Sequence, residues 1–162
     1  MIFRSPQDLS LRNLEIPSVF LAGSIETGKA TDWQTDMGNF LSARGFAVFN
    51  PRRDEWDASW VQEFENPQFF HQVNWEIDGL EKADHIIMYF EPSTLSPISL
   101  LELGLFARSG KLLVVCPRGF WRKGNVDIVC SRYNIPTFDS LDSIKEFFLN
   151  KTVEKKPKPT DK

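Results

Sequence analysis

The chain has 162 residues, 41% of them apolar and 25% charged, as is ordinary for one soluble globular domain. Its length predicts a single domain over residues 1–150. The longest apolar stretches are far shorter than the roughly 20 residues that span a bilayer. Arg4, Asp8 and Arg12 interrupt the apolar core that a secretory signal needs. These features argue against transmembrane and secreted proteins, so we expect a cytoplasmic protein that does not bind a membrane.

The net charge of −3 is unevenly distributed along the chain. Residues 151–162 carry five lysines against two acidic residues, and the other 150 residues carry 14 basic and 20 acidic groups. Because the last twelve residues contain two prolines and no apolar periodicity, we predict a disordered basic tail there. Neutralising phosphates needs a basic face, so the acidic body argues against a nucleic-acid polymer as ligand.

Cysteine and histidine are scarce in the sequence, which argues against a disulfide scaffold and against common metal sites. Cys116 and Cys130 are too few for a disulfide scaffold, and the sequence contains no Cys-x-x-Cys pair for zinc. With two histidines in the chain, a histidine-rich metal centre is not expected. We expect no metal and no organic cofactor.

Short apolar runs alternate with segments of helical periodicity along the chain. We predict strands at 18–22, 46–49, 85–90, 112–116 and 135–138, and helices at 30–43, 67–82, 97–109, 127–133 and 140–150. Alternation of this kind predicts an α/β fold whose parallel sheet is covered on both faces. The order suggests a flavodoxin-like three-layer sandwich with a five-stranded parallel sheet.

Ligands of such sheets bind beyond the carboxyl ends of the strands. The predicted functional loops are therefore 23–29, 50–66, 91–97 and 117–125.

Glu102 is the most informative single position. Leucine, isoleucine and phenylalanine surround it on all sides of its predicted helix, which is typical of a buried helix. A lone buried carboxylate costs several kcal/mol unless it is paired or used. We therefore interpret Glu102 as a catalytic carboxylate. The alternatives are a narrow solvent-facing stripe or an ion pair with Arg108.

A second acidic group precedes the third predicted strand. It contains Glu76, Asp78, Glu81 and Asp84. A solvated helix face explains Glu81 best, whereas Glu76 can approach Glu102 at the edge of the sheet. Two carboxyl groups in one pocket allow acid–base and nucleophilic chemistry at a glycosidic bond.

Other candidates follow the first and second predicted strands. The backbone N–H groups of Gly23 and Ser24 are suited to an anionic or hydroxyl-bearing ligand. Arg52 and Arg53 can bind phosphate, or they can be ordinary surface charges. Trp56 lies in a polar loop and is a candidate lid over a bound base.

Five pieces of the sequence, taken together and in order, resemble the nucleoside 2-deoxyribosyltransferase superfamily, and most closely its nucleoside 2-deoxyribosyltransferase-like branch. They cover roughly residues 18 to 136. The pieces are Val19 to Ser24 with Trp33, Asn50 to Arg53 with Trp56, Gln72 to Glu76 with Ala83 and Asp84, Ser96 to Gly104, and Gly119 to Asp127.

The resemblance implies a flavodoxin-like fold and a covalent mechanism. By the match to the family motif, Glu102 would attack C1′ of a deoxyribonucleoside and form a deoxyribosyl-enzyme, which a free nucleobase or water then resolves. Glu76 matches the residue that handles the base, and Asp78 is the second choice. The substrate-binding residues that we expect are Gly23, Ser24, Asn50, Arg52, Arg53, Trp56, Ser96, Ser99 and Asn125.

The resemblance also implies partners and leaves three functions open. A loop matching the one around Asn125 can come from a neighbouring subunit, which implies a homodimer or a larger homo-oligomer. The first function is a transferase that moves deoxyribose between bases. The second is an N-glycoside hydrolase that acts on 2′-deoxynucleoside 5′-phosphates. Hydrolases of this kind also carry a serine at the position of Ser96. The third is a non-catalytic nucleotide-binding module, favoured by Phe20 where the family has tyrosine.

Overall fold

The computed structural model describes residues 1–7, 9, 16–25, 30–53 and 61–151. The segment 54–60, with Trp56, and the predicted tail from residue 152 lie outside the described residues. The strands are β1 (Ile2–Arg4), β2 (Ser18–Gly23), β3 (Ala47–Asn50), β4 (His85–Tyr89), β5 (Leu112–Val115) and β6 (Thr137–Phe138). The helices are α1 (Trp33–Ala43), α2 (Pro67–Lys82), α3 (Pro97–Phe106), α4 (Lys123–Arg132) and α5 (Leu141–Leu149).

The strands of the described chain form one parallel sheet in the order β1-β3-β2-β4-β5-β6. This confirms the predicted α/β class and is consistent with the flavodoxin-like arrangement, but the sheet has six strands rather than five. The additional strand is β1, which pairs with β3 through Ile2 and Val48. Its three residues are only half-buried at the sheet edge, so the sequence there lacks the continuous apolar run of the inner strands.

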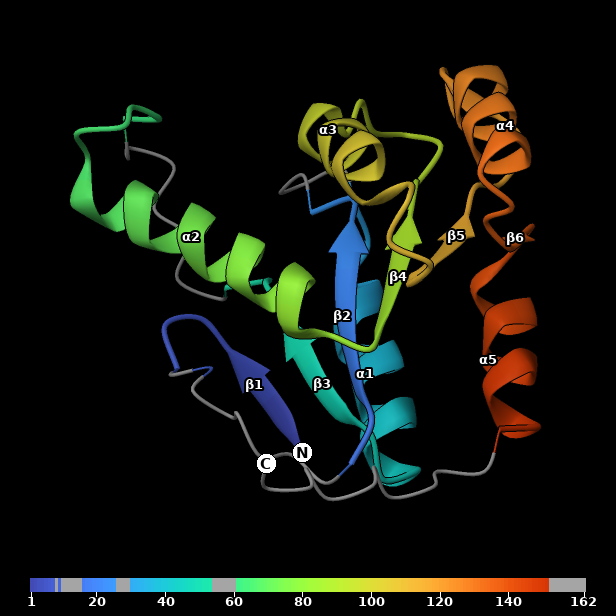
Figure 1. Ribbon diagram of the computed structural model, residues 1–162, viewed down its shortest axis with the longest axis horizontal. Coiled ribbons are helices and arrows are strands. Elements are labelled where there is room, and N and C mark those ends of the chain that lie inside the picture. Colours follow the sequence, from blue (N-terminus) through green and yellow to red (C-terminus); the bar gives the residue numbers. More distant parts are fainter. Residues whose placement is uncertain (8, 10–15, 26–29, 54–60, 152–162) are drawn as a thin grey trace, which may run out of the picture.

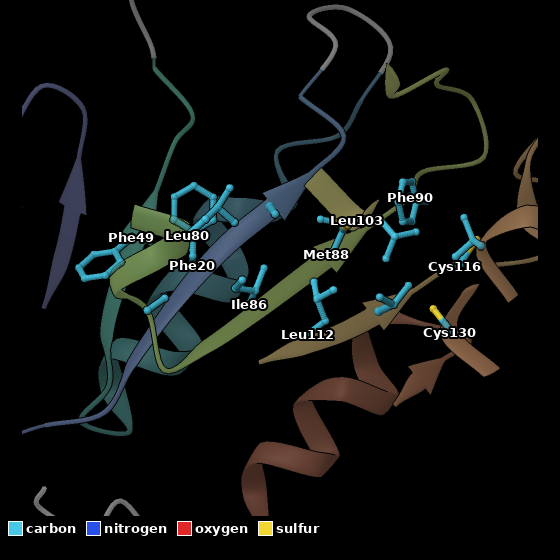
Figure 2. Packing of buried hydrophobic residues seen from close by; sticks show 14 of the residues in the cluster. Phe20, Phe49, Leu80, Ile86, Met88, Phe90, Leu103, Leu112, Cys116 and Cys130 are labelled. Carbon is cyan, nitrogen blue, oxygen red and sulfur yellow. The ribbon is translucent and has the colours of Figure 1, made fainter. Parts of the chain in front are cut away.

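Helices cover both faces of the sheet (Figure 1). Helices α2, α3 and α4 lie on one face, and α1 and α5 lie on the other. Side chains of β2 alternate between the two layers, because successive residues of a strand point to opposite faces. Phe20 packs with the first set of helices and Leu21 with the second. Figure 2 shows the first of these cores, in which Phe20, Met88 and Leu103 are buried together.

Local signals fix several helix ends. The side chain of Asn66 caps α2 by accepting a hydrogen bond from the Phe69 N–H, and Pro67 takes the first helical position as predicted. Helix α4 begins at Lys123, four residues before the prediction. No side chain caps it, and Gly124 lowers the helix propensity of its first turn. No helix among the described residues is both long enough and apolar enough to cross a membrane.

Helix α3 is not the fully buried helix that its composition predicted. Ile98, Leu101 and Leu105 are 60%, 59% and 65% exposed. The helix follows β4 beyond the edge of the sheet and buries only Ser99 and Leu103. The apolar residues on its outer face are therefore not covered by any other described element of the chain.

Candidate active site

The carboxyl groups of Glu76 on α2 and Glu102 on α3 interact electrostatically. Glu76 lies in the third turn of α2, and Glu102 lies in the second turn of α3, the helix that follows the loop after β4. Both side chains are partly buried. The charge of Glu76 is close enough to raise the pKa of Glu102. The structure therefore brings together the two acidic residues that the sequence singled out.

Burial dominates the titration of both groups. Loss of solvation, reinforced by the negative charge of Glu76, raises the pKa of Glu102 to about 8. Loss of solvation also raises the pKa of Glu76 to about 7, although a hydrogen bond from Gln72 and the positive charge of Arg53 act in the opposite direction. Between about pH 7 and about pH 8 the two groups together therefore bind about one proton, and Glu102, whose pKa is the higher, binds it more strongly. The form that acid–nucleophile chemistry requires, with Glu102 ionised and Glu76 protonated, is the less populated of the two singly protonated forms.

Asp78, the second choice for the acid, does not join this pair. It is two residues from Glu76 on α2, and residues two apart point to opposite sides of a helix. Its carboxylate is 57% exposed and forms an ion pair with Lys82 at 3.3 Å. Of these two residues of α2, only Glu76 therefore contributes a carboxyl group to the site.

Gly23 and Ser24 organise the strand ends rather than present free backbone donors. The N–H of Ser24 donates to the carbonyl oxygen of Tyr89, so it does not face a ligand as the sequence suggested. The Ser24 hydroxyl accepts a hydrogen bond from the Glu91 N–H and lies 2.8 Å from the Thr94 hydroxyl. Ser24 thus holds the loop between β4 and α3 against the end of β2.

Ser96 belongs to the same buried hydroxyl cluster. Its Oγ lies 2.7 Å from Ser24 Oγ and 2.8 Å from Thr94 Oγ1. Ser96 adopts a left-handed backbone conformation (φ 47°) just before Pro97, and its side chain does not cap α3. Because its hydroxyl is already hydrogen-bonded, a phosphate contact at Ser96 would have to replace bonds within the cluster.

The segment after β3 carries two cations toward the site. The side-chain oxygen of Asn50 accepts a hydrogen bond from the Arg52 N–H at 3.0 Å, which shapes the turn. Arg52 is held by the carbonyl of Thr31 and the carboxylate of Asp32. Arg53 lies close enough to Glu76 to lower its pKa. Arg53 is therefore a cation whose charge acts on Glu76.

Asn125 lies on the other side of α3. It is exposed in the first turn of α4 and lines a groove of about 290 Å³ together with Leu100 and Gly104 of α3. Residues 100 and 104 are each two positions from Glu102, and thus on the opposite side of the helix. In Figure 1, α3 lies between α2 and α4. Asn125 therefore does not meet Glu102 of the same chain.

Ser99 is buried on α3, three residues before Glu102 and thus on nearly the same face of the helix. Trp56 lies outside the described residues. Within the part of the chain that the structure describes, no group of three or more histidine, cysteine or acidic side chains is arranged to hold a metal ion.

Two residues of this region had no role assigned from the sequence: Gln72, which appeared only within a family motif, and Thr94. Gln72 donates a hydrogen bond to Glu76, a contact signalled by their spacing of four residues on one helix. Thr94 completes the hydroxyl cluster. No local pattern marks Thr94, because its partner Ser24 lies 70 residues away.

No curated protein matches this chain. A family described as nucleoside 2-deoxyribosyltransferase like matches residues 16–120. The matched segment begins before β2 and includes Glu76, Glu102 and the hydroxyl cluster. The chain therefore belongs to the nucleoside 2-deoxyribosyltransferase-like family.

Proposed function

We propose that the protein is a nucleoside 2-deoxyribosyltransferase, which cleaves the N-glycosidic bond of a 2′-deoxynucleoside and passes the sugar to another base. The observation that carries the proposal is the pair of Glu76 and Glu102. Their elevated pKa values allow one of them to be ionised and the other protonated near neutral pH. Membership of the family supports a nucleoside or nucleobase substrate.

The reaction proceeds as a double displacement. The carboxylate of Glu102 attacks C1′, and the C1′–N bond breaks with its electron pair moving to the base nitrogen. Glu76 donates its proton to the departing base. A second base then attacks C1′, gives its proton to Glu76 and releases Glu102. The lack of a 2′-hydroxyl makes the oxocarbenium-like transition state easier to reach, so a deoxyribose donor fits this chemistry. No cofactor is required.

Chromatography of reaction mixtures tests this function. The full chain is incubated with each deoxynucleoside, and separately with each deoxynucleoside 5′-phosphate, with and without a free acceptor base. A new nucleoside that appears only with acceptor supports the transferase. The absence of any reaction from every donor would overturn the enzymatic proposal and favour a nucleotide-binding module.

The second candidate is an N-glycoside hydrolase that acts on deoxynucleoside 5′-phosphates. The position of Arg53 beside Glu76 favours it, because a guanidinium next to the carboxyl pair can neutralise a phosphate-bearing substrate. The same chromatography separates the two functions. Release of free base without acceptor, and only from the 5′-phosphates, would select the hydrolase.

The pH dependence of kcat/KM is expected to be bell-shaped, with its maximum between about pH 7 and about pH 8. At lower pH both carboxyl groups are protonated and the nucleophile is lost. At higher pH both are ionised, and the base has no proton donor. A steady-state profile from about pH 6 to about pH 9 checks this. A flat profile over that range would contradict the roles of the two glutamates as nucleophile and proton donor.

We propose further that the chain forms a homodimer through the outer faces of α3 and α4. Ile98, Leu101 and Leu105 of α3 are exposed together, and Ile128 of α4 is 70% exposed. Contiguous apolar surface of this kind is typical of interfaces. Asn125 lies on α4, next to this surface. In the proposed dimer, Asn125 of one subunit approaches Glu102 of the other.

Introducing charge into this surface is expected to produce monomers and to lower activity at least tenfold. The variant is Leu101→Glu with Leu105→Glu, because burying two carboxylates at an interface is costly. Light scattering after size-exclusion chromatography should give twice the mass of one chain for the wild type and the mass of one chain for this variant. The control is Leu149→Glu on α5, which is also exposed but lies on the opposite face of the sheet. A monomeric wild type would contradict the proposal.

A further inference from the structure

Gln72 has an unusual set of contacts for a buried amide. Its side chain is only 2% exposed. Its amide nitrogen Nε2 donates to Glu76 Oε1 at 2.8 Å and to the carbonyl oxygen of Pro51 at 3.3 Å. Its carbonyl oxygen Oε1 is buried and has no hydrogen-bond partner among the residues that the structure describes. Both amide hydrogens are therefore used, while the acceptor is not.

The orientation of this amide follows from its neighbours. Turning the amide over would place its oxygen against the carbonyl oxygen of Pro51, and two acceptors cannot bond to each other. The nitrogen must therefore face Pro51, and the same nitrogen faces Glu76. The unpaired oxygen is a consequence of this arrangement.

Stability alone does not explain the arrangement. A buried acceptor without a donor destabilises a fold, since it has lost its water and gained no partner. A methionine of similar size would fill the same space without that cost. What the glutamine adds is a fixed donor to one oxygen of Glu76, tied through Pro51 to the end of β3.

We propose that Gln72 is a positioning residue for the acid of the reaction. It binds Oε1 of Glu76 as an acceptor, which leaves Oε2 to carry the proton that the departing base receives. This inference rests on the proposed function, and it gives a role to a residue that the sequence motif contains but to which no function was assigned. Gln72 acts through Glu76 and does not touch the reacting atoms.

The pKa of Glu76 depends on the charged and polar groups around it. Glu102 faces it from α3, and Arg53 faces it from the segment after β3. Gln72 acts from within α2 and favours the ionised form, as does Arg53. Removal of the amide donor therefore strengthens proton binding by the pair, whichever of the two carboxyl groups holds the proton.

The variant Gln72→Met tests the proposal. A hydrogen bond to a carboxylate corresponds to a pKa change of roughly one unit. The pH optimum lies midway between the two limbs of the bell, so it should move up by about half a unit. We expect kcat to fall about tenfold with KM little changed, because the proton is no longer held on one oxygen. An unchanged optimum and kcat would overturn the proposal.

A second measurement does not depend on turnover. Carbon-13 NMR of glutamate-labelled protein, with the Glu76 signal assigned by its loss in Glu76→Gln, gives the titration midpoint of Glu76 directly. We expect that midpoint to rise in Gln72→Met and in Gln72→Asn, whose shorter side chain cannot span both partners. Gln72→Asn also provides the test if Gln72→Met does not fold. Equal midpoints in wild type and both variants would overturn the proposal.

The control is Asn74→Met, which removes an exposed amide of the same helix that bonds only to the Phe70 carbonyl among its described contacts. It should leave the midpoint of Glu76 unchanged. If the wild type cleaves no nucleoside but the midpoint shifts as expected, the proposed function fails while the hydrogen bond that places the proton is upheld.

Discussion

Replacing Glu102 by alanine is expected to lower base exchange by roughly 10³-fold or more, because the nucleophile that forms the covalent intermediate is removed. The side chain is partly buried, and its negative charge is disfavoured by this burial and by the charge of Glu76. Its removal relieves that cost. Above about pH 8, where Glu102 is ionised in the folded wild type, the variant should therefore unfold at the same or a higher temperature.

Two measurements separate loss of chemistry from loss of fold in this variant. Chromatographic rates give the activity, and circular dichroism melting gives the stability. The control is Glu81→Ala, which removes an exposed carboxylate of α2 that has no role in the proposed mechanism. It should retain full activity. If the Glu102→Ala variant retained more than about a tenth of wild-type activity, Glu102 would not be the nucleophile.

Replacing Gly23 by alanine is expected to destabilise the fold by about 3 kcal/mol or more and to lower Tm by about 10 °C. Gly23 has a φ of +127°, a conformation that side chains rarely adopt. A Cβ there would lie 2.2 Å from the carbonyl oxygen of Tyr89 on the neighbouring strand β4. Backbone atoms in the middle of a sheet cannot move aside cheaply, so β2 and β4 would have to separate.

The matched control is Gly124→Ala in α4, where an added Cβ meets no atom within 4 Å. Alanine favours a helix more than glycine does, so this variant should be as stable as wild type or slightly more stable. Urea titrations of both variants give the two free energies of unfolding. A Gly23→Ala protein that is as stable as wild type would contradict the close approach of β2 and β4.

The α/β class could be predicted because the inner strands are buried on both faces. All six residues of β2 are buried, so its sequence is a continuous apolar run. Strand β1 could not be predicted in this way, since its residues Ile2–Arg4 are only half-buried. Its identity as a strand depends on pairing with β3, which is a tertiary contact.

Glu102 was singled out by an argument that the structure only partly supports. The apolar residues around it predicted a helix buried on every side, yet Leu101 and Leu105 are exposed. Glu102 is nevertheless partly buried, which raises its pKa, and the charge of Glu76 raises it further. Hydrophobicity alone cannot distinguish an apolar face covered by the same chain from one left uncovered.

Contacts between distant segments explain the remaining differences. The N–H of Ser24 was expected to face a ligand, but the carbonyl of Tyr89 binds it. The spacing of Gln72 and Glu76 was visible in the sequence, whereas the bond from Gln72 to Pro51 was not, because it joins α2 to the segment after β3. The position of a site is therefore more predictable than the hydrogen bonds that support it.

The central claim is that Glu102 forms a covalent bond to deoxyribose. Mass spectrometry of the intact protein, quenched with acid after brief mixing with a deoxynucleoside in the absence of acceptor base, tests it most directly. We predict that one deoxyribosyl group is added per chain, that peptide mapping places it on Glu102, and that it disappears when acceptor is supplied. An adduct on another residue, or base exchange with no adduct at any mixing time, would contradict the account.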